Sequence, residues 1–140
     1  MGFNDDIIAE FRANDGIVTT MGFGKSLVVL HTVGARSGRP LENPLMGLPS
    51  ESGGVLVIGS AGGSPKNPAW VHNVRAEPNI TIERHVDDGI VREQVTAREL
   101  HDDEWEAAWA TFTARSRGFE KYTETAEGRR FPIFELTPAQ

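Results

Sequence analysis

The sequence predicts a mainly β protein with inserted helices (α+β), in which about six antiparallel strands form a barrel. Short apolar runs rich in Val, Ile and Leu alternate with turn-forming Gly, Pro, Asn and Asp. Asp87-Asp88-Gly89 joins two of these runs with a strong hairpin signal. The chain lacks the regular alternation of strand and helix that a doubly wound parallel sheet requires. An antiparallel barrel is therefore the expected architecture.

The first part of the chain predicts one helix and three closely spaced strands. Residues 5–13 have the apolar spacing of a short amphipathic helix, which Asn14-Asp15-Gly16 ends. The continuous apolar run 27–30 and the segment 43–48 predict two strands joined by the turn-rich loop 34–40. A third strand at 55–59 is apolar enough to be buried on both faces. Such close succession indicates antiparallel pairing.

The second part of the chain predicts two helices and three strands. Pro68 suits the first position of a helix that reaches Ala76, and Asn67 is a suitable cap for it. Asp102-Asp103-Glu104 provide the negative charge that a helix start favours. The apolar face of that second helix consists of Trp105, Ala108, Trp109 and Phe112. The remaining strands are expected at 80–84, 90–98 and 131–136.

Composition limits the classes of function. The chain has 140 residues, 39% hydrophobic and 24% charged, so we expect a single domain over residues 1–140. A formal charge of −6 argues against a nucleic-acid partner. Because there is no cysteine, disulfides, thiolate nucleophiles and Cys-ligated metal centres are excluded.

The expected location is cytoplasmic. The N-terminal residues lack the basic end and the apolar stretch of a signal peptide. No apolar run approaches the ~20 residues that a membrane span needs. The alternative is a protein peripheral to the membrane, with the helix at 5–13 as a weak anchor.

Two loops at strand ends have the residues of an anion site. The loop 34–40 holds Arg36 and Ser37 between glycines, where backbone N–H groups, a hydroxyl and a guanidinium can surround an oxyanion. The loop 59–68 places Lys66 just before a helix N-terminus, and Gly62 and Gly63 allow the backbone to approach a flat ring or a phosphate. Ordinary solvated turns are the alternative for each loop taken alone. The segment from Gly24 to Arg75 is also locally basic, which favours an anionic small ligand.

The histidines and the residues of the predicted helix at 68–76 give weaker functional signals than the two loops. The four histidines show no metal-ligand spacing, so we assign no metal. Trp70 and Asn73, three residues apart, can share a face of the predicted helix. Core packing is the alternative for Trp70, because a tryptophan buries a large apolar area.

Taken together, these motifs resemble those of the deazaflavin-dependent nitroreductase family of actinobacteria. The segments that carry the resemblance are Leu30-His31-Thr32, Arg36-Ser37-Gly38-Arg39-Pro40, Asn43-Pro44-Leu45, Ser60-Ala61-Gly62-Gly63 and Lys66-Asn67-Pro68-Ala69-Trp70 with Asn73. The resemblance extends over nearly the whole chain. It implies a split β-barrel of the FMN-binding type that takes coenzyme F420 in place of a flavin.

The resemblance also implies where the cofactor lies. Arg36, Ser37, Asn43 and Pro44 would line its phosphate and ring side. Ser60, Ala61, Gly62 and Gly63 would lie along the deazaflavin ring. Lys66 would meet the anionic tail, and Trp70 and Asn73 would close the pocket.

The implied function is hydride transfer from reduced F420 to an electron-poor organic molecule, such as an enone, an unsaturated lactone, a quinone or a nitro compound. Ser60 and Tyr122 are the candidate catalytic side chains, with backbone N–H groups and water as the alternative. Ser116 and Phe119 stand where the nitroreductase itself has tyrosines near its substrate. A non-catalytic F420 storage or carrier protein and a membrane-associated quinone reductase are the alternative functions. The sequence leaves the oligomeric state open.

Overall fold

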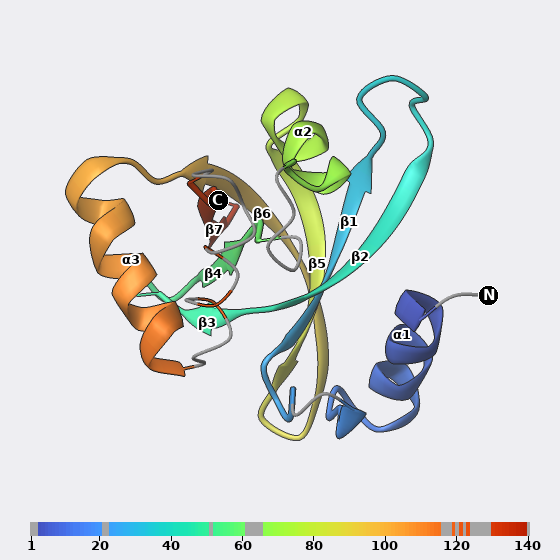
Figure 1. Cartoon of the computed structure of the whole chain (residues 1–140). Helices are drawn as coiled ribbons and strands as arrows, with labels where there is room; N and C mark the ends of the chain where they lie inside the picture. Colours follow the sequence, from blue (N-terminus) through green and yellow to red (C-terminus); the bar gives the residue numbers. More distant parts are fainter. Residues whose placement is uncertain are drawn as a thin grey trace.

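The computed structural model describes residues 3–20, 23–50, 52–60, 66–115, 119, 121, 123 and 130–139. Its strands form one antiparallel sheet in the order β2-β1-β5-β6-β7-β4-β3. The strands are β1 (Leu27–Val33), β2 (Pro40–Met46), β3 (Leu48–Pro49), β4 (Val55–Ile58), β5 (Asn79–Val86), β6 (Gly89–Glu99) and β7 (Ile133–Pro138). The helices are α1 (Phe3–Ala13), α2 (Ala69–Ala76) and α3 (Asp102–Arg115). Figure 1 shows the sheet curling, with α1 and α3 at its two sides.

The sheet curls because its two edge strands are neighbours in the sequence. β2 pairs with β1 at one edge, and β3 pairs with β4 at the other, with only Gly47 between them. A Cβ at Gly47 would overlap a methyl group of Val28 and lie 2.6 Å from Cγ1 of Val55. The absence of a side chain therefore lets the chain cross from one edge to the other. The predicted antiparallel, barrel-like architecture is confirmed.

The strand count differs from the expected six. The segment 43–48 was expected to form one strand, but Gly47 divides it into β2 and β3. The N–H of Gly47 bonds to the carbonyl of Ser26 at 2.7 Å, outside the β1–β2 ladder. The change of partner follows from the curvature of the whole sheet, which no local pattern encodes.

The largest core cluster lies between α2 and the inner face of the curled sheet. Trp70, Val71 and Val74 of α2 pack there against side chains from both ends of the strand order, such as Leu30 of β1 and Val57 of β4. All five are at most 4% exposed. α2 is thereby fixed inside one end of the barrel, where Figure 1 shows it next to the β1–β2 hairpin.

α1 covers the outer face of β1. Its apolar residues Ile7, Ile8 and Phe11 pack with Leu27 and Val29, and Phe11 is fully buried. The helix begins at Phe3, slightly before the expected start, and ends as expected before a turn with left-handed backbone. The side chains Ile7, Ile8 and Phe11, which a membrane anchor would use, are therefore packed against the sheet of the same chain.

α3 covers the outer face near β4 and β7. It begins at Asp102, as the acidic run predicts, and buries Trp105, Ala108 and Phe112. The indole N–H of Trp105 donates to the carbonyl of Phe131 at 2.8 Å. Phe119 packs edge-on against Phe112 with a centroid distance of 5.5 Å, so it belongs to this cluster. Among the described residues, no helix combines the length and apolar character needed to cross a membrane.

Candidate functional site

An open cavity of about 520 Å³ separates the β1–β2 loop from α2. Its lining residues come from the end of β1 onward and from one face of the helix: Gly34, Ala35, Arg36, Ser37, Leu41, Ala69, His72 and Asn73. The sequence predicted Arg36, Ser37 and Asn73 as site residues. It did not predict Leu41 or His72, although the spacing of Ala69, His72 and Asn73 places them on one helical face.

The β1–β2 loop is held in shape by its own hydrogen bonds. The N–H of Gly34 donates to the carbonyl of Arg39, and the N–H of Gly38 donates to the carbonyl of Gly34, both at 2.9 Å. Ser37 Oγ accepts the N–H of Arg39 at 3.2 Å. A Cβ at Gly34 would force Ser37 Oγ to move, and Gly38 has a φ of +71°, a conformation that favours glycine. The loop therefore presents Arg36 from an ordered turn.

One side-chain hydrogen bond attaches this loop to α2. Asn73 Oδ1 accepts the backbone N–H of Ala35 at 2.9 Å. Asn73 is only 5% exposed, whereas Ala35 is exposed. The amide of Asn73 is thus part of the wall between the helix and the loop.

The second predicted loop reaches the same helix from β4. A Cβ at Gly59 would lie 2.6 Å from Val71 Cγ2, so the end of β4 touches α2 directly. Ser60 follows and is partly exposed, and Lys66 is exposed just before the helix. Ala61, Gly62 and Gly63 lie outside the described residues. α2 therefore lies next to the β1–β2 loop and to the described ends of the second loop, at one end of the barrel.

The start of α2 differs from the prediction. The N-cap residue is Pro68, with φ −66° and ψ 155°, and the helix begins at Ala69. Pro68 makes no side-chain cap hydrogen bond, and it occupies the cap position that was expected for Asn67. Proline fixes φ near the helical value, but the ψ of Pro68 is extended, so the helix starts one residue later than the pattern indicates.

The positive charge of the cavity rests on Arg36. The ion pairs among described residues engage Arg12, Arg75, Arg84, Arg98 and Arg130, and do not include Arg36. Arg75, on the same helix as His72, donates to both oxygens of Glu99 at 2.8 and 2.9 Å. These hydrogen bonds hold the pKa of Glu99 below its ordinary value, so this pair is charged and internally compensated. Part of the basic charge seen in the sequence is therefore not available to a ligand.

The other predicted residues are placed differently. Asn43 lies below the loop, where its Oδ1 accepts the hydroxyl of buried Thr32 at 3.1 Å. Pro44 pairs with Val29, so strand alternation directs it to the α1 side, away from Asn43. Trp70 is 4% exposed and lies 5.7 Å from the ring of Phe134 in the core, in line with the core-packing alternative. Tyr122 lies outside the described residues.

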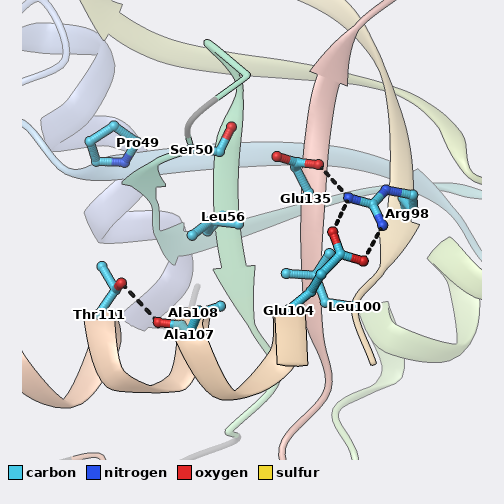
Figure 2. A pocket seen from close by; sticks show the side chains of 10 residues that line it. All are labelled: Pro49, Ser50, Leu56, Arg98, Leu100, Glu104, Ala107, Ala108, Thr111 and Glu135. Carbon is cyan, nitrogen blue, oxygen red and sulfur yellow. Dashed lines mark hydrogen bonds and ion pairs between the residues drawn. The ribbon is translucent and has the colours of Figure 1, made fainter. Parts of the chain in front are cut away.

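A second cavity, of about 220 Å³, lies between α3 and the sheet and contains none of the predicted site residues. Figure 2 shows Arg98 at its rim, between Glu104 and Glu135. Arg98 donates to both oxygens of Glu104 at 2.9 Å and to Glu135 at 2.8 Å. Because the charged groups there satisfy one another and the floor is apolar, such as Leu56 and Leu100, we assign no chemistry to it.

A cluster of charged residues that are far apart in the sequence lies on the outer face of the barrel. His31, Glu42 and Glu83 come from three neighbouring strands and bring ligand-type atoms within 4.8 Å of one another. Arg12 bonds to both carboxylates. The guanidinium already supplies the positive charge that a metal ion would bring, so we assign no metal to this group.

Comparison with known proteins gives consistent matches. A family model described as F420H(2)-dependent quinone reductase matches residues 6–138. An F420H(2)-dependent quinone reductase of Mycobacterium tuberculosis is 28% identical over 112 residues, which cover 79% of this chain and 72% of that protein. The solved structure of an F420-H2 dependent reductase, FDR-A, is 31% identical with a TM-score of 0.67, covering 80% of this chain and 94% of that chain.

A more distant structure shares the fold alone. HutZ, the heme storage protein of Vibrio cholerae, is 19% identical with a TM-score of 0.62, and the match covers 98% of this chain and 91% of HutZ. Similar barrels therefore serve proteins with different ligands, and the ligand of this chain must be argued from its own cavity and from its nearer relatives.

Proposed function

This chain belongs to the family of F420H(2)-dependent quinone reductases, and from that membership we propose which acceptors it reduces and which of its residues hold the cofactor. The resemblance to F420-dependent reductases predicted from the motifs is confirmed. The chain is an oxidoreductase whose cofactor is reduced coenzyme F420. We propose quinones and other planar, conjugated carbonyl compounds as its acceptors.

The observation that carries the proposal is the cavity between the β1–β2 loop and α2. F420 combines a flat ring with a phosphodiester and an oligoglutamate tail, so its site needs a basic side and a flat apolar side. Arg36 and Ser37 give the cavity a basic, hydrogen-bonding side, and Leu41 and Ala69 give it an apolar one. Arg36 has no ion pair with another described residue, so its charge is available to an anionic ligand. The residues present therefore fit the cofactor.

We assign the cofactor contacts as follows. Arg36 and Ser37 meet the phosphodiester, and Lys66, at the start of α2, meets the tail. Ser60 and the Ala61-Gly62-Gly63 loop lie along the ring. Asn43 and Asn73 support the loop from below and from α2. Pro44 faces α1 and Trp70 packs in the core, so we assign neither a direct contact with the cofactor.

When bound, reduced F420 supplies a hydride, which is the difficult part of the chemistry. The protein orients the acceptor against the ring and stabilises the negative charge that develops on the acceptor oxygen. We propose the hydroxyl of Ser60 as one hydrogen-bond donor to that oxygen, because Ser60 lies two residues after the end of β4 and is partly exposed. Tyr122 is the second proposed donor.

Two alternative functions make different predictions. A storage or carrier protein binds F420 but does not catalyse its oxidation. A membrane-associated reductase requires a surface that binds lipid, and the apolar face of α1 is buried against β1. Neither alternative is favoured by a feature of the cavity.

The test combines binding and turnover. The purified protein should bind F420 more tightly than flavin mononucleotide in fluorescence titrations, and it should oxidise reduced F420 when a quinone such as menadione is added. Ser60→Ala should slow turnover and leave cofactor affinity nearly unchanged, with Ser26→Ala, at the other end of β1, as the matched control. Tighter binding of the flavin would sink the cofactor assignment, whereas binding of F420 without turnover on any acceptor would favour the carrier.

A further inference from the structure

We propose that Asn73 is a positioning residue that aims Arg36 at the cofactor by holding the β1–β2 loop, and that it does so through the backbone of Ala35. The inference rests on the proposed function, because it concerns the same cavity. It assigns Asn73 an action through the loop, which differs from direct contact with the cofactor.

The hydrogen bond of Asn73 reaches the residue next to Arg36. Asn73 Oδ1 accepts the N–H of Ala35 at 2.9 Å, across 38 positions in the sequence. Ala35 immediately precedes Arg36, and both line the cavity together with Asn73. Loss of this bond would therefore move Ala35 and, with it, Arg36, which we assign to the phosphodiester of the cofactor.

The side chain of Asn73 is buried on the core side of α2. Asn73 is 5% exposed on a helix whose neighbours Trp70, Val71 and Val74 all pack in the barrel core. A buried side-chain amide with an acceptor bond of good geometry has few rotamers open to it. The acceptor atom is therefore fixed to the rigid part of the molecule, and the exposed loop takes its position from it.

The rest of the β1–β2 loop is held by hydrogen bonds of its own. The described hydrogen bonds of Gly34, Ser37, Gly38 and Arg39 stay within the loop. They define its shape but not its angle to α2. Among the described residues, the bond from Ala35 to Asn73 joins the loop to the helix across the cavity, so it sets the width of the cavity.

The test replaces Asn73 by Leu, which has a similar size and lacks the acceptor. The loss of one hydrogen bond should weaken binding of F420 by roughly fivefold to tenfold. The amide proton of Ala35 should exchange with solvent faster by a similar factor, measured by NMR without any cofactor. Asn79→Ala is the matched control, because Asn79 Oδ1 accepts a hydroxyl bond from Thr96 on an exposed surface away from the cavity.

A double-mutant cycle separates positioning from contact. If Asn73 acts by aiming Arg36, the effect of Asn73→Leu on F420 affinity should largely disappear in an Arg36→Gln background. Ala35→Pro removes the donor from the exposed loop and should reproduce the loss of affinity, which keeps the test valid if Asn73→Leu does not fold.

The outcomes are distinct. Unchanged affinity in Asn73→Leu, or equal losses with and without Arg36, would overturn the positioning role while the proposed function stands. Failure of the native protein to bind F420 would overturn the proposed function itself. Faster exchange at Ala35 together with a non-additive loss of affinity supports the inference.

Discussion

The guanidinium of Arg12 on α1 donates a 2.8 Å hydrogen bond to the carboxylate of Glu83 on β5. Glu83 is only 7% exposed, and its carboxylate also bonds to His31. A buried carboxylate is tolerated when it is paired and hydrogen-bonded, as it is here. α1 is therefore attached to the barrel by a specific charge pair in addition to its apolar contacts.

This pair predicts a loss of stability in acid. Burial raises the pKa of Glu83, but the hydrogen bonds from Arg12 and His31 outweigh burial and hold the pKa below the ordinary value of 4.5. A carboxylate with a lowered folded-state pKa stabilises the protein above its unfolded pKa, and this contribution is lost as pH falls through the folded pKa. We expect the free energy of unfolding, measured with urea, to decrease below about pH 4.5. The decrease should be smaller in Glu83→Gln, and an identical pH dependence in the two proteins would contradict the assignment.

Removing the cation should be costly for the same reason. Arg12→Met leaves Glu83 without its strongest donor and should lower the free energy of unfolding by about 1–3 kcal/mol. Arg75→Met is the matched control, because Arg75 is about as exposed as Arg12 and pairs with Glu99, whose side chain is more exposed than that of Glu83. The control should cost less than about 1 kcal/mol. Equal losses would show that the burial of Glu83 is not what matters.

The fold was largely predictable because its strands are marked by local signals. The Asp87-Asp88-Gly89 hairpin, the β-branched run of β1 and the acidic start of α3 each act over a few residues, and all three are where the sequence predicts them. The division of the segment 43–48 into two strands at Gly47 was not predictable, because it depends on the pairing of β3 with β4 at the opposite edge of the sheet. The charged group of His31, Glu42 and Glu83 was not predictable either, because only the pairing of the three strands brings these residues together.

The site was only partly predictable. The two loops were found from their glycines and basic residues, which are local features. His72 was missed because a single histidine on a short helix gives no signal until the opposite loop is in place. Arg75 counted as basic charge in the sequence, whereas the structure pairs it with Glu99.

The closure of the barrel at Gly47 gives the third prediction. Gly47→Ala would place a methyl group against Val28 and Val55, both of which are core residues. Overpacking of this kind should lower the free energy of unfolding by about 1–3 kcal/mol, measured by thermal or urea unfolding. Gly89→Ala is the control, because a Cβ there meets no atom within 4 Å. Equal stability of the two variants would show that there is room for a side chain at Gly47 between β2 and β3.

Phe119 gives the fourth prediction, which replaces an expectation from the resemblance. The resemblance places Phe119 where the nitroreductase has a tyrosine near its substrate. If that placement holds, a tyrosine here adds a hydrogen-bond donor beside the substrate and favours nitro compounds. Phe119 is 8% exposed and packs on Phe112, so Phe119→Tyr adds its hydroxyl to the α3 cluster. We expect a loss of about 1–2 kcal/mol in stability and no change in the ratio of kcat/KM for a nitroimidazole to that for an unsaturated lactone. Phe23→Tyr, at a partly exposed position, is the control and should lower the stability less. A raised kcat/KM ratio in Phe119→Tyr would show that Phe119 lines the substrate pocket.

The last prediction concerns Lys66, which lies exposed just before α2 and which we assign to the anionic tail of F420. Lys66→Ala removes one positive charge at the helix N-terminus, where anions are already favoured. Binding of long-tailed F420 should weaken roughly fivefold to tenfold at low salt, in line with an exposed charge pair. A precursor without the tail should bind almost as before, and kcat should hold nearly constant at saturating cofactor. Fluorescence titration of the two cofactor forms measures the difference.

The salt dependence and the control decide where Lys66 acts. An exposed charge pair is screened at physiological ionic strength, where the Debye length is about 8 Å, so the difference between native protein and Lys66→Ala should shrink as salt is added. Lys25→Ala removes the same charge from the turn before β1, at the end of that strand opposite the cavity loop, and should bind both cofactor forms like the native protein. Equal losses for the tailed and tail-less cofactors in Lys66→Ala would mean that its ammonium group meets the phosphodiester or the ring side of the site. In that case the tail would have to leave the cavity along the Arg36 side.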